Sequence, residues 1–343
     1  MDRLIFLSLC IIACLLFTQS ADVEAQGLGV NYGLLGNNLP PPALVVEHLK
    51  YHKITKVRIF QPYPDVLQAL KGSEIEVFLG TLNEDLERLA ADQSFANKWV
   101  QDNILAYIDG VKFRYITAGN EVIPGPYAQY VLGAMQNLKN ALDAAKVNIP
   151  VSTVVALTVL GSSYPPSNAT FSNESLDTMS KIVAFLSQNQ YPMFANVYPC
   201  FAYFQDPKII SEEYALGNKN APAVEDGTLK YNNMFEAMVD SVYAALEKVG
   251  GNNVKVVVSE TGWPSAGGEF ATVSHARSYV TNVIHLLATA KGKGTPRRPE
   301  FPVETYIFAL FNENLKPPGT EQNFGIYHPD TRAPVYVTYF PNI

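Results

Sequence analysis

Eight short runs of apolar and β-branched residues recur along the chain, and amphipathic stretches with helical spacing separate them. The runs lie at 28–33, 56–60, 76–81, 113–118, 151–156, 194–198, 254–259 and 304–311. Eight strand-then-helix units in one chain are typical of a closed (β/α)8 barrel. A doubly wound sheet is the alternative, but no glycine-rich phosphate loop follows the first run. We therefore predict an α/β fold, a single (β/α)8 (TIM) barrel, with an elaborated loop region after the sixth strand (200–230).

The N-terminus has the three-part pattern of a secretory signal peptide. Charged residues 2–3 precede an apolar run at 4–17, and small residues come before a cleavage position after Ala25. The apolar run is short for a membrane span, and an uncleaved anchor is the alternative. We predict a cleaved signal peptide at 1–25 and one hydrolase barrel domain at 26–343. The expected location is the extracellular space or the cell wall, without a membrane anchor.

Composition and charge narrow the functional classes. The net charge is -7 and no Lys/Arg-rich run occurs, so the basic footprint of a nucleic-acid binder is missing. The mature chain keeps only Cys200, which excludes a disulfide within it and predicts a buried structural thiol. The five histidines lack metal-ligand spacing, so we expect neither a metal nor a cofactor. Two sequons, at Asn168 and Asn173, are candidate glycosylation sites.

Glutamates follow three predicted strands at the barrel end where such folds hold their active sites. Glu121 follows the fourth strand, Glu260 the seventh and Glu313 the eighth. Cleavage of a glycosidic bond needs one carboxyl group that carries a proton and one that is ionised. The fourth and seventh strands lie on opposite sides of the barrel, so Glu121 and Glu260 can approach a sugar from two sides. A single strand-end glutamate is more often a solvated rim residue, but this pair favours catalysis.

Two neighbours of these glutamates suit a carbohydrate. Asn120 is placed to hydrogen-bond a sugar 2-hydroxyl, an interaction that strengthens in the transition state. Trp263 offers an apolar face on which a sugar ring can stack.

The motifs resemble those of the plant glucan endo-1,3-β-glucosidases of glycoside hydrolase family 17. The likeness covers essentially the whole mature chain, and the segment Val257-Val-Ser-Glu-Thr-Gly-Trp-Pro-Ser265 is highly specific. The other segments that carry it, in order, lie at 29–33, 35–40, 113–116, 119–122, 195–199, 311–314 and 324–327.

The resemblance implies a monomeric, retaining endo-β-1,3-glucanase that acts on callose-like or fungal-wall glucan. Glu121 would be its acid/base and Glu260 its nucleophile, with the two carboxyl groups about 5–5.5 Å apart. The positions that match other cleft residues of the family are Tyr32, Tyr198, Glu313, Lys316 and Glu321, and Lys316 is expected near Glu260. A salt-bridge network that holds the loop after the eighth strand is an equal alternative for Glu313, Lys316 and Glu321.

The second strand departs from the family pattern. It ends Arg58-Ile-Phe-Gln61, where an Arg-Leu-Tyr-Asp-like run is usual. Phe60 keeps a stacking face for substrate but lacks the hydroxyl, Gln61 lacks the charge, and Cys200 stands where an aromatic residue is common. These changes leave linkage preference open. A mixed-linkage 1,3-1,4-β-glucanase and a weakly active glucan-binding wall protein are therefore the alternatives.

Overall fold

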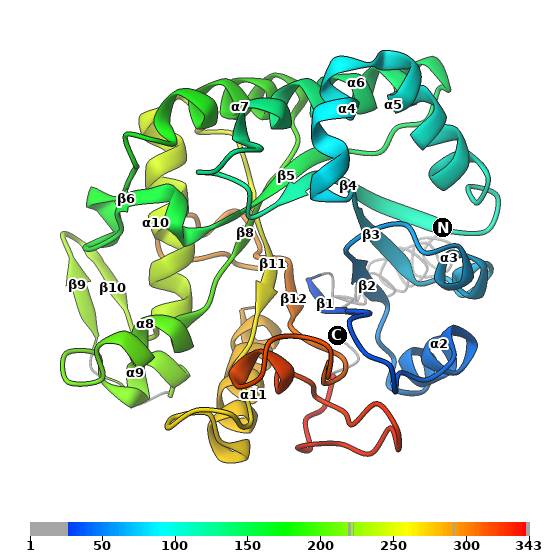
Figure 1. Ribbon diagram of the computed structural model, residues 1–343. Coiled ribbons are helices and arrows are strands. Elements are labelled where there is room, and N and C mark those ends of the chain that lie inside the picture. The colour runs from blue at the N-terminus through cyan, green and yellow to red at the C-terminus, as the bar shows by residue number, and fades with distance from the viewer. Residues whose placement is uncertain (1–26, 219–220, 222, 291, 341–343) are drawn as a thin grey trace, which may run out of the picture.

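Eight parallel strands close a barrel in the order β1-β12-β11-β8-β5-β4-β3-β2 (Figure 1), which confirms the predicted (β/α)8 fold. The computed structural model describes residues 27–218, 221, 223–290 and 292–340. The predicted signal peptide lies outside these residues. The barrel strands are β1 (Leu28–Asn31), β2 (Lys56–Ile59), β3 (Glu76–Gly80), β4 (Lys112–Asn120), β5 (Val151–Ala156), β8 (Met193–Asn196), β11 (Val256–Thr261) and β12 (Thr305–Ile307).

Helices between the strands cover the outside of the barrel. Their local sequence explains where they begin and which face they bury. In one of them the Asn233 side chain accepts the Glu236 N–H and donates to the Glu236 carboxylate, a reciprocal cap at the first turn. The main helices are α2 (Pro42–Tyr51), α3 (Pro64–Leu70), α4 (Leu86–Ala91), α5 (Gln93–Val100), α6 (Ala128–Ala144), α7 (Leu176–Asn189), α10 (Met234–Lys248) and α11 (Val273–Thr289).

Two insertions enlarge one side of the barrel (Figure 1). The elaborated region predicted after the sixth strand contains α8 (Pro199–Gln205), α9 (Glu212–Leu216) and the hairpin of β9 (Val224–Asp226) and β10 (Leu229–Tyr231). A second hairpin, β6 (Leu160–Ser162) with β7 (Thr170–Phe171), follows β5. The two insertions are joined because Asp226 accepts hydrogen bonds from the backbone N–H and the hydroxyl of Ser167, at 2.7 and 2.5 Å.

Side chains inside the barrel form two layers of different chemistry. The apolar layer contains Phe78, Val154, Phe194, Val257 and Tyr306. Above it, buried polar side chains point inward from the strand ends, namely Asn31, Arg58, Asn196 and Glu260. Buried polar groups are costly unless they are hydrogen-bonded, so this second layer depends on the network described below.

Candidate active site

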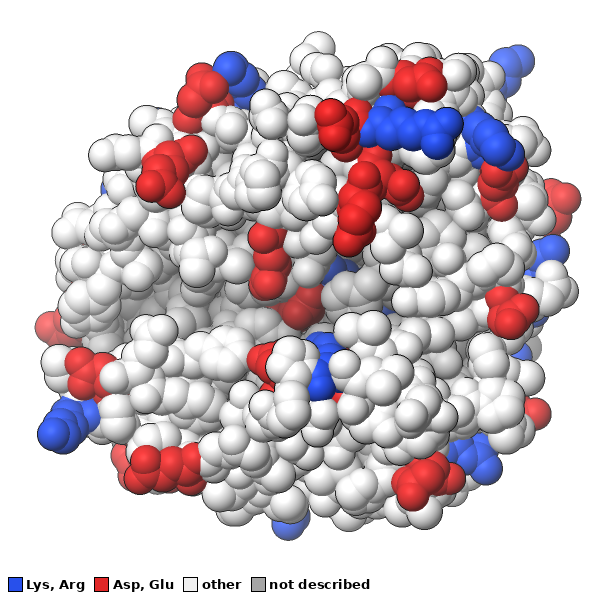
Figure 2. Space-filling model, viewed as in Figure 1, with Lys and Arg blue, Asp and Glu red and all other residues white. Residues whose placement is uncertain are grey.

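A cleft of about 730 Å³ opens at the C-terminal ends of the barrel strands, and both Glu121 and Glu260 line it. Figure 2 shows that this face of the molecule is hollowed and that acidic and basic side chains gather in the hollow. Six further residues predicted for the site also line the cleft, namely Phe60, Asn120, Tyr198, Glu313, Lys316 and Glu321. The fold thus brings together eight of the ten predicted catalytic and sugar-binding residues.

The structure corrects the other two predicted sugar contacts, because Trp263 and Tyr32 lie in the core. Trp263 is 0% exposed, and its indole N–H donates to the Phe270 carbonyl at 2.9 Å. The chain turns outward after β11, so the indole packs against Tyr279 of α11. Tyr32 is 3% exposed. It follows the inward-facing Asn31, so strand alternation directs its ring away from the barrel interior.

Glu260 is held by two donors at the base of the cleft. Arg58 Nη1 donates to Oε1 at 2.5 Å, and the Tyr198 hydroxyl donates to Oε2 at 2.7 Å. Burial, followed by the negative charge of Glu260, raises the pKa of Tyr198 well above its usual value, so this hydroxyl remains a donor. The cation paired with Glu260 is Arg58, and Lys316, which was expected near Glu260, lines the same cleft.

Arg58 was not predicted as a site residue, yet it links several parts of the site. It is 1% exposed, and its guanidinium lies 4.5 Å from the Phe60 ring centroid and 5.0 Å from that of Phe78. Its Nη2 donates to Asn120 Oδ1 at 2.7 Å. A guanidinium can only donate, so this contact identifies the Asn120 oxygen and leaves Asn120 Nδ2 for another acceptor. The sequence feature that could have identified Arg58 is a charged residue between Val57 and Ile59, at the otherwise apolar end of a predicted strand.

The backbone at the end of β4 holds Glu121 in an uncommon conformation. Its φ is 56°, in the left-handed region, which costs a residue with a side chain about 1–2 kcal/mol. Three contacts offset this cost. Asn83 accepts the Asn120 N–H at 2.9 Å and donates to the Asn120 carbonyl at 3.2 Å. The Glu121 N–H donates to the Val154 carbonyl on β5 at 2.9 Å.

The surroundings of the Glu121 carboxyl group differ from those of Glu260. Asn196 Nδ2 donates to Glu121 Oε1 at 2.8 Å. Desolvation by the cleft walls, followed by the negative charge of Glu260, raises the pKa of Glu121, while Asn196 and Arg58 oppose the rise. The Glu121 side chain is exposed to solvent in the cleft, which screens these effects. The two carboxyl groups of the cleft therefore have different environments, as two carboxyl groups with different catalytic roles do.

Lys316 connects the other two cleft carboxylates. Its Nζ lies 3.5 Å from Glu313 Oε2 and 3.9 Å from Glu321 Oε2, and 4.2 Å from the centroid of the Phe308 ring. Glu313 also accepts the Leu35 N–H at 2.8 Å and lies against Gly33. A Cβ at Gly33 would lie 2.3 Å from the Glu313 carboxylate oxygens, so a larger residue there would have to displace this carboxylate. The salt-bridge network is present, and all three members line the cleft.

Aromatic side chains that were not predicted for the site form much of the cleft wall. They are Tyr63, Phe201, Phe308 and Phe324. Phe201, on α8, is 37% exposed and lies 5.2 Å from Tyr198 between ring centroids. Such faces are suitable for stacking against sugar rings. The sequence offered two signals for them, an aromatic content of 11% and, for Phe324, its place in the segment 324–327 that resembles the family.

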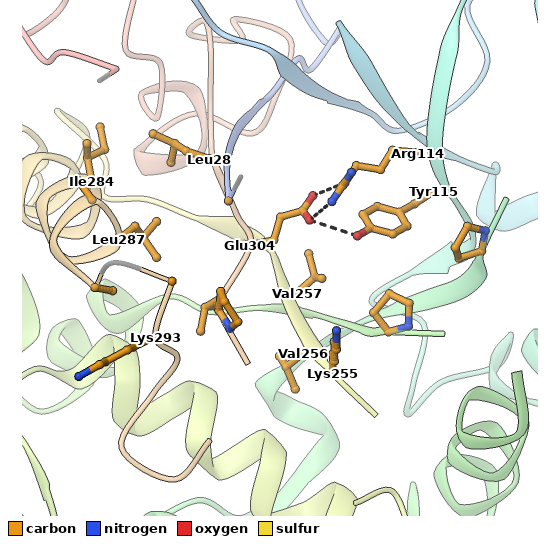
Figure 3. Close-up of a pocket in the computed structure, with 18 of the residues that line it drawn as sticks. Leu28, Arg114, Tyr115, Lys255, Val256, Val257, Ile284, Leu287, Lys293 and Glu304 are labelled. Carbon is orange, nitrogen blue, oxygen red and sulfur yellow. Dashed lines mark hydrogen bonds and ion pairs between the residues drawn. The ribbon is translucent and has the colours of Figure 1, made fainter. Parts of the chain in front are cut away.

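A second pocket, of about 670 Å³, lies at the opposite end of the barrel. Figure 3 shows Arg114 and Tyr115 pointing toward Glu304 there. Arg114 donates to both Glu304 oxygens, at 2.7 and 2.6 Å, and the Tyr115 hydroxyl donates at 3.1 Å. These charges satisfy one another, and polar networks at this face of a (β/α)8 barrel contribute to stability. Among the described residues that line this pocket, Glu304 is the one carboxyl group.

The remaining features of the chain bear on metal binding, thiol chemistry and membrane insertion. Within the described ranges, no group of three or more His, Cys, Asp or Glu side chains could hold a metal ion. Cys200 is buried and free, and burial raises the pKa of its thiol, as expected of a structural cysteine. None of the helices that the structure describes is long and apolar enough to span a membrane.

Comparison with known proteins identifies the family. The model of the glycosyl hydrolases family 17 matches residues 28–340. A glucan endo-1,3-β-glucosidase of Vitis vinifera is 46% identical over 324 residues, which cover 92% of this chain and 93% of the relative.

Two solved structures have the same fold. One is CJP38, a β-1,3-glucanase and allergen of Cryptomeria japonica pollen, at 47% identity and a TM-score of 0.87 over 92% of this chain and 99% of that one. The other belongs to a pair of plant β-glucan endohydrolases with distinct substrate specificities, at 41% identity and a TM-score of 0.87 over 92% and 100%. The chain belongs to the glycosyl hydrolases family 17.

Proposed function

We propose that this protein is a retaining endo-β-1,3-glucanase in which Glu260 is the nucleophile and Glu121 the acid/base. The observation that carries the proposal is the pair of carboxyl groups in one cleft with opposite surroundings. Glu260 is bound by Arg58 and Tyr198, whereas the pKa of Glu121 is raised. The names of the relatives support the substrate and the reaction class.

The proposed first step forms a covalent glycosyl-enzyme. A carboxylate oxygen of Glu260 attacks the anomeric carbon while the bond from that carbon to the leaving sugar oxygen breaks. The proton of Glu121 moves to the leaving oxygen, so Glu121 becomes a carboxylate. Asn120 Nδ2, which is left free by Arg58, would donate to the sugar 2-hydroxyl.

The second step returns the enzyme to its starting state. A water oxygen attacks the anomeric carbon, and the bond to Glu260 breaks. Glu121 accepts the proton of that water and is again the acid. The reaction needs two carboxyl groups and water, without a cofactor.

The open cleft suits a polymer that is cut at internal bonds. Linkage needs its own test, because one solved relative belongs to a pair of β-glucan endohydrolases with distinct substrate specificities. Phe60 and Gln61, which depart from the family pattern, line the cleft and alter the groups that it offers to a sugar. A mixed-linkage 1,3-1,4-β-glucanase and a weakly active glucan-binding protein remain the alternatives.

Product formation on laminarin and on barley mixed-linkage glucan tests the proposal. Wild type should release oligosaccharides from laminarin, Glu260→Gln should release none, and Glu213→Gln, at an exposed position on α9, should behave as wild type. Preference for the mixed-linkage polymer would change the substrate. Binding of either glucan by a folded wild type that releases no product would contradict the enzyme and favour the binding protein.

We also propose that the chain is secreted as a monomer after cleavage behind Ala25. The sequon residues Asn168 and Asn173 are both exposed, as glycosylation requires. N-terminal sequencing, intact mass before and after glycan removal, and size-exclusion chromatography test these points. An intact residue 1 in the secreted fraction, or a dimer mass, would contradict them.

A further inference from the structure

Asn196, at the end of β8, joins the two sides of the site through its amide group. The residue is 2% exposed. Its Nδ2 donates to Glu121 Oε1 at 2.8 Å, and its Oδ1 accepts the Ser259 hydroxyl at 2.7 Å. It therefore contacts the acid/base directly and reaches the residue next to Glu260 on β11.

The neighbours of Asn196 fix which end of the amide faces Glu121. Asn120 Oδ1 lies 3.5 Å from Asn196 Nδ2, and Arg58 has already identified that Asn120 atom as an acceptor. The amide nitrogen must therefore face this side. On the other side the Ser259 carbonyl is bound by Arg58 and Asn31, and the Ser259 hydroxyl donates to Asn196 Oδ1.

We propose that Asn196 is a positioning residue that selects which oxygen of Glu121 carries the catalytic proton. Because the Nδ2–H group already occupies Oε1, the proton of the acid form resides on Oε2. The same bond becomes charge-assisted when Glu121 is ionised, so it also favours the base needed in the second step. Ser259 holds the amide in the required orientation. The inference rests on the proposed role of Glu121.

Other charged groups also face Glu121 and contribute to its titration. Glu260 on β11 and Glu321 on the 3-10 helix Thr320–Gln322 raise its pKa, and Arg58 on β2 lowers it. Asn196 supplies the hydrogen bond that lowers the pKa. Loss of this one donor should therefore move the Glu121 titration upward while the three charges stay in place.

Kinetics of Asn196→Ala on two substrates test the proposal. Laminarin oligosaccharides have a poor leaving group and need the acid, whereas a dinitrophenyl β-laminaribioside does not. We expect kcat/KM to fall about 10- to 100-fold on the oligosaccharides, the range for a lost hydrogen bond to a charged group. We expect a change of less than about threefold on the dinitrophenyl glycoside. The basic limb of the pH profile should move to higher pH.

Matched variants keep the test decisive. Ser259→Ala should give the same changes at smaller size, and Asn140→Ala, at an exposed position on α6, should give none. Asn196→Leu has nearly the same shape and replaces the alanine variant if that protein does not fold. It lacks the donor and adds no charge, so its basic limb should also move upward.

The variant Glu121→Gln distinguishes a failure of the proposed role of Glu121 from a failure of the positioning role of Asn196. If this variant still hydrolyses laminarin oligosaccharides, the proposed function of Glu121 fails. If the variant no longer hydrolyses the oligosaccharides but still hydrolyses the dinitrophenyl glycoside, Glu121 is the acid. In that case the positioning role would be overturned if Asn196→Ala lowers kcat/KM equally on both substrates and the basic limb of its pH profile stays in place.

Discussion

Replacement of Arg58 by methionine should damage both stability and catalysis. The change removes the guanidinium that donates to Glu260 Oε1 at 2.5 Å and to Asn120 Oδ1 at 2.7 Å. Methionine keeps much of the volume between the Phe60 and Phe78 rings. The variant therefore tests the charge and its hydrogen bonds more than the packing.

The expected size follows from the burial of the pair. Removal of one partner of a buried ion pair typically costs about 3–5 kcal/mol, because the other charge is left unpaired. A fall in melting temperature of about 5–10 °C follows for a chain of this size. The loss of a hydrogen bond to the nucleophile should lower kcat/KM by about 10- to 150-fold.

A double-mutant cycle with Glu260→Gln provides the assay. Urea unfolding of the four proteins should show that Arg58→Met costs at least about 1.5 kcal/mol less when residue 260 is glutamine. Arg114→Met, at the opposite end of the barrel, should lower stability but change kcat/KM by less than about threefold. An equal cost of Arg58→Met in both backgrounds would refute the reasoning, because the cost would then not come from the unpaired carboxylate.

Other predictions follow from single side chains. Burial raises the pKa of Asp240 from 3.8 to about 6, so its contribution to stability is present below about pH 4 and is lost as the pH rises through 6. Asp240→Asn should remove a fall of about 3 kcal/mol between pH 3.5 and 7.5, and melting curves that stay parallel to wild type would contradict this. Trp263→Leu should lower the free energy of unfolding in urea by about 3 kcal/mol with little change in KM. Phe201→Ala should raise KM severalfold with little loss of stability. The reverse pattern would contradict the assignment of Trp263 to the core and Phe201 to the cleft. Gly33→Ala should displace the Glu313 carboxylate and lower kcat/KM on laminarin at least tenfold, while unchanged kinetics would show that Glu313 can move without loss.

The barrel and the position of its two cleft glutamates could be predicted because both depend on short-range patterns. Apolar runs alternating with helical stretches predict parallel strands, and reactive residues of this fold lie at the strand ends. Glu121 and Glu260 satisfy that rule without any knowledge of register. The strand bounds differ from the predicted ranges by a few residues, most at the last strand, where only Thr305–Ile307 is regular.

The contacts among these residues depended on information that one sequence lacks. Arg58 points into the barrel because of strand alternation and register, and its partner Glu260 is 202 residues away. Asn196 contacts Glu121 across 75 residues. Trp263 was placed in the cleft because of its neighbour Glu260, yet the chain turns outward between the two. Adjacency in sequence does not fix side-chain direction after a strand ends.

The central claim is that Glu260 forms a covalent bond with the sugar, and trapping the intermediate tests it most directly. The protein would be incubated with a 2-deoxy-2-fluoro β-laminaribiosyl fluoride, digested and examined by peptide mass spectrometry. We predict one added glycosyl unit per chain, attached to Glu260 in the segment 257–265, with activity lost as the label accumulates. A label on another residue, or turnover of the substrate with inversion and no label, would contradict the account.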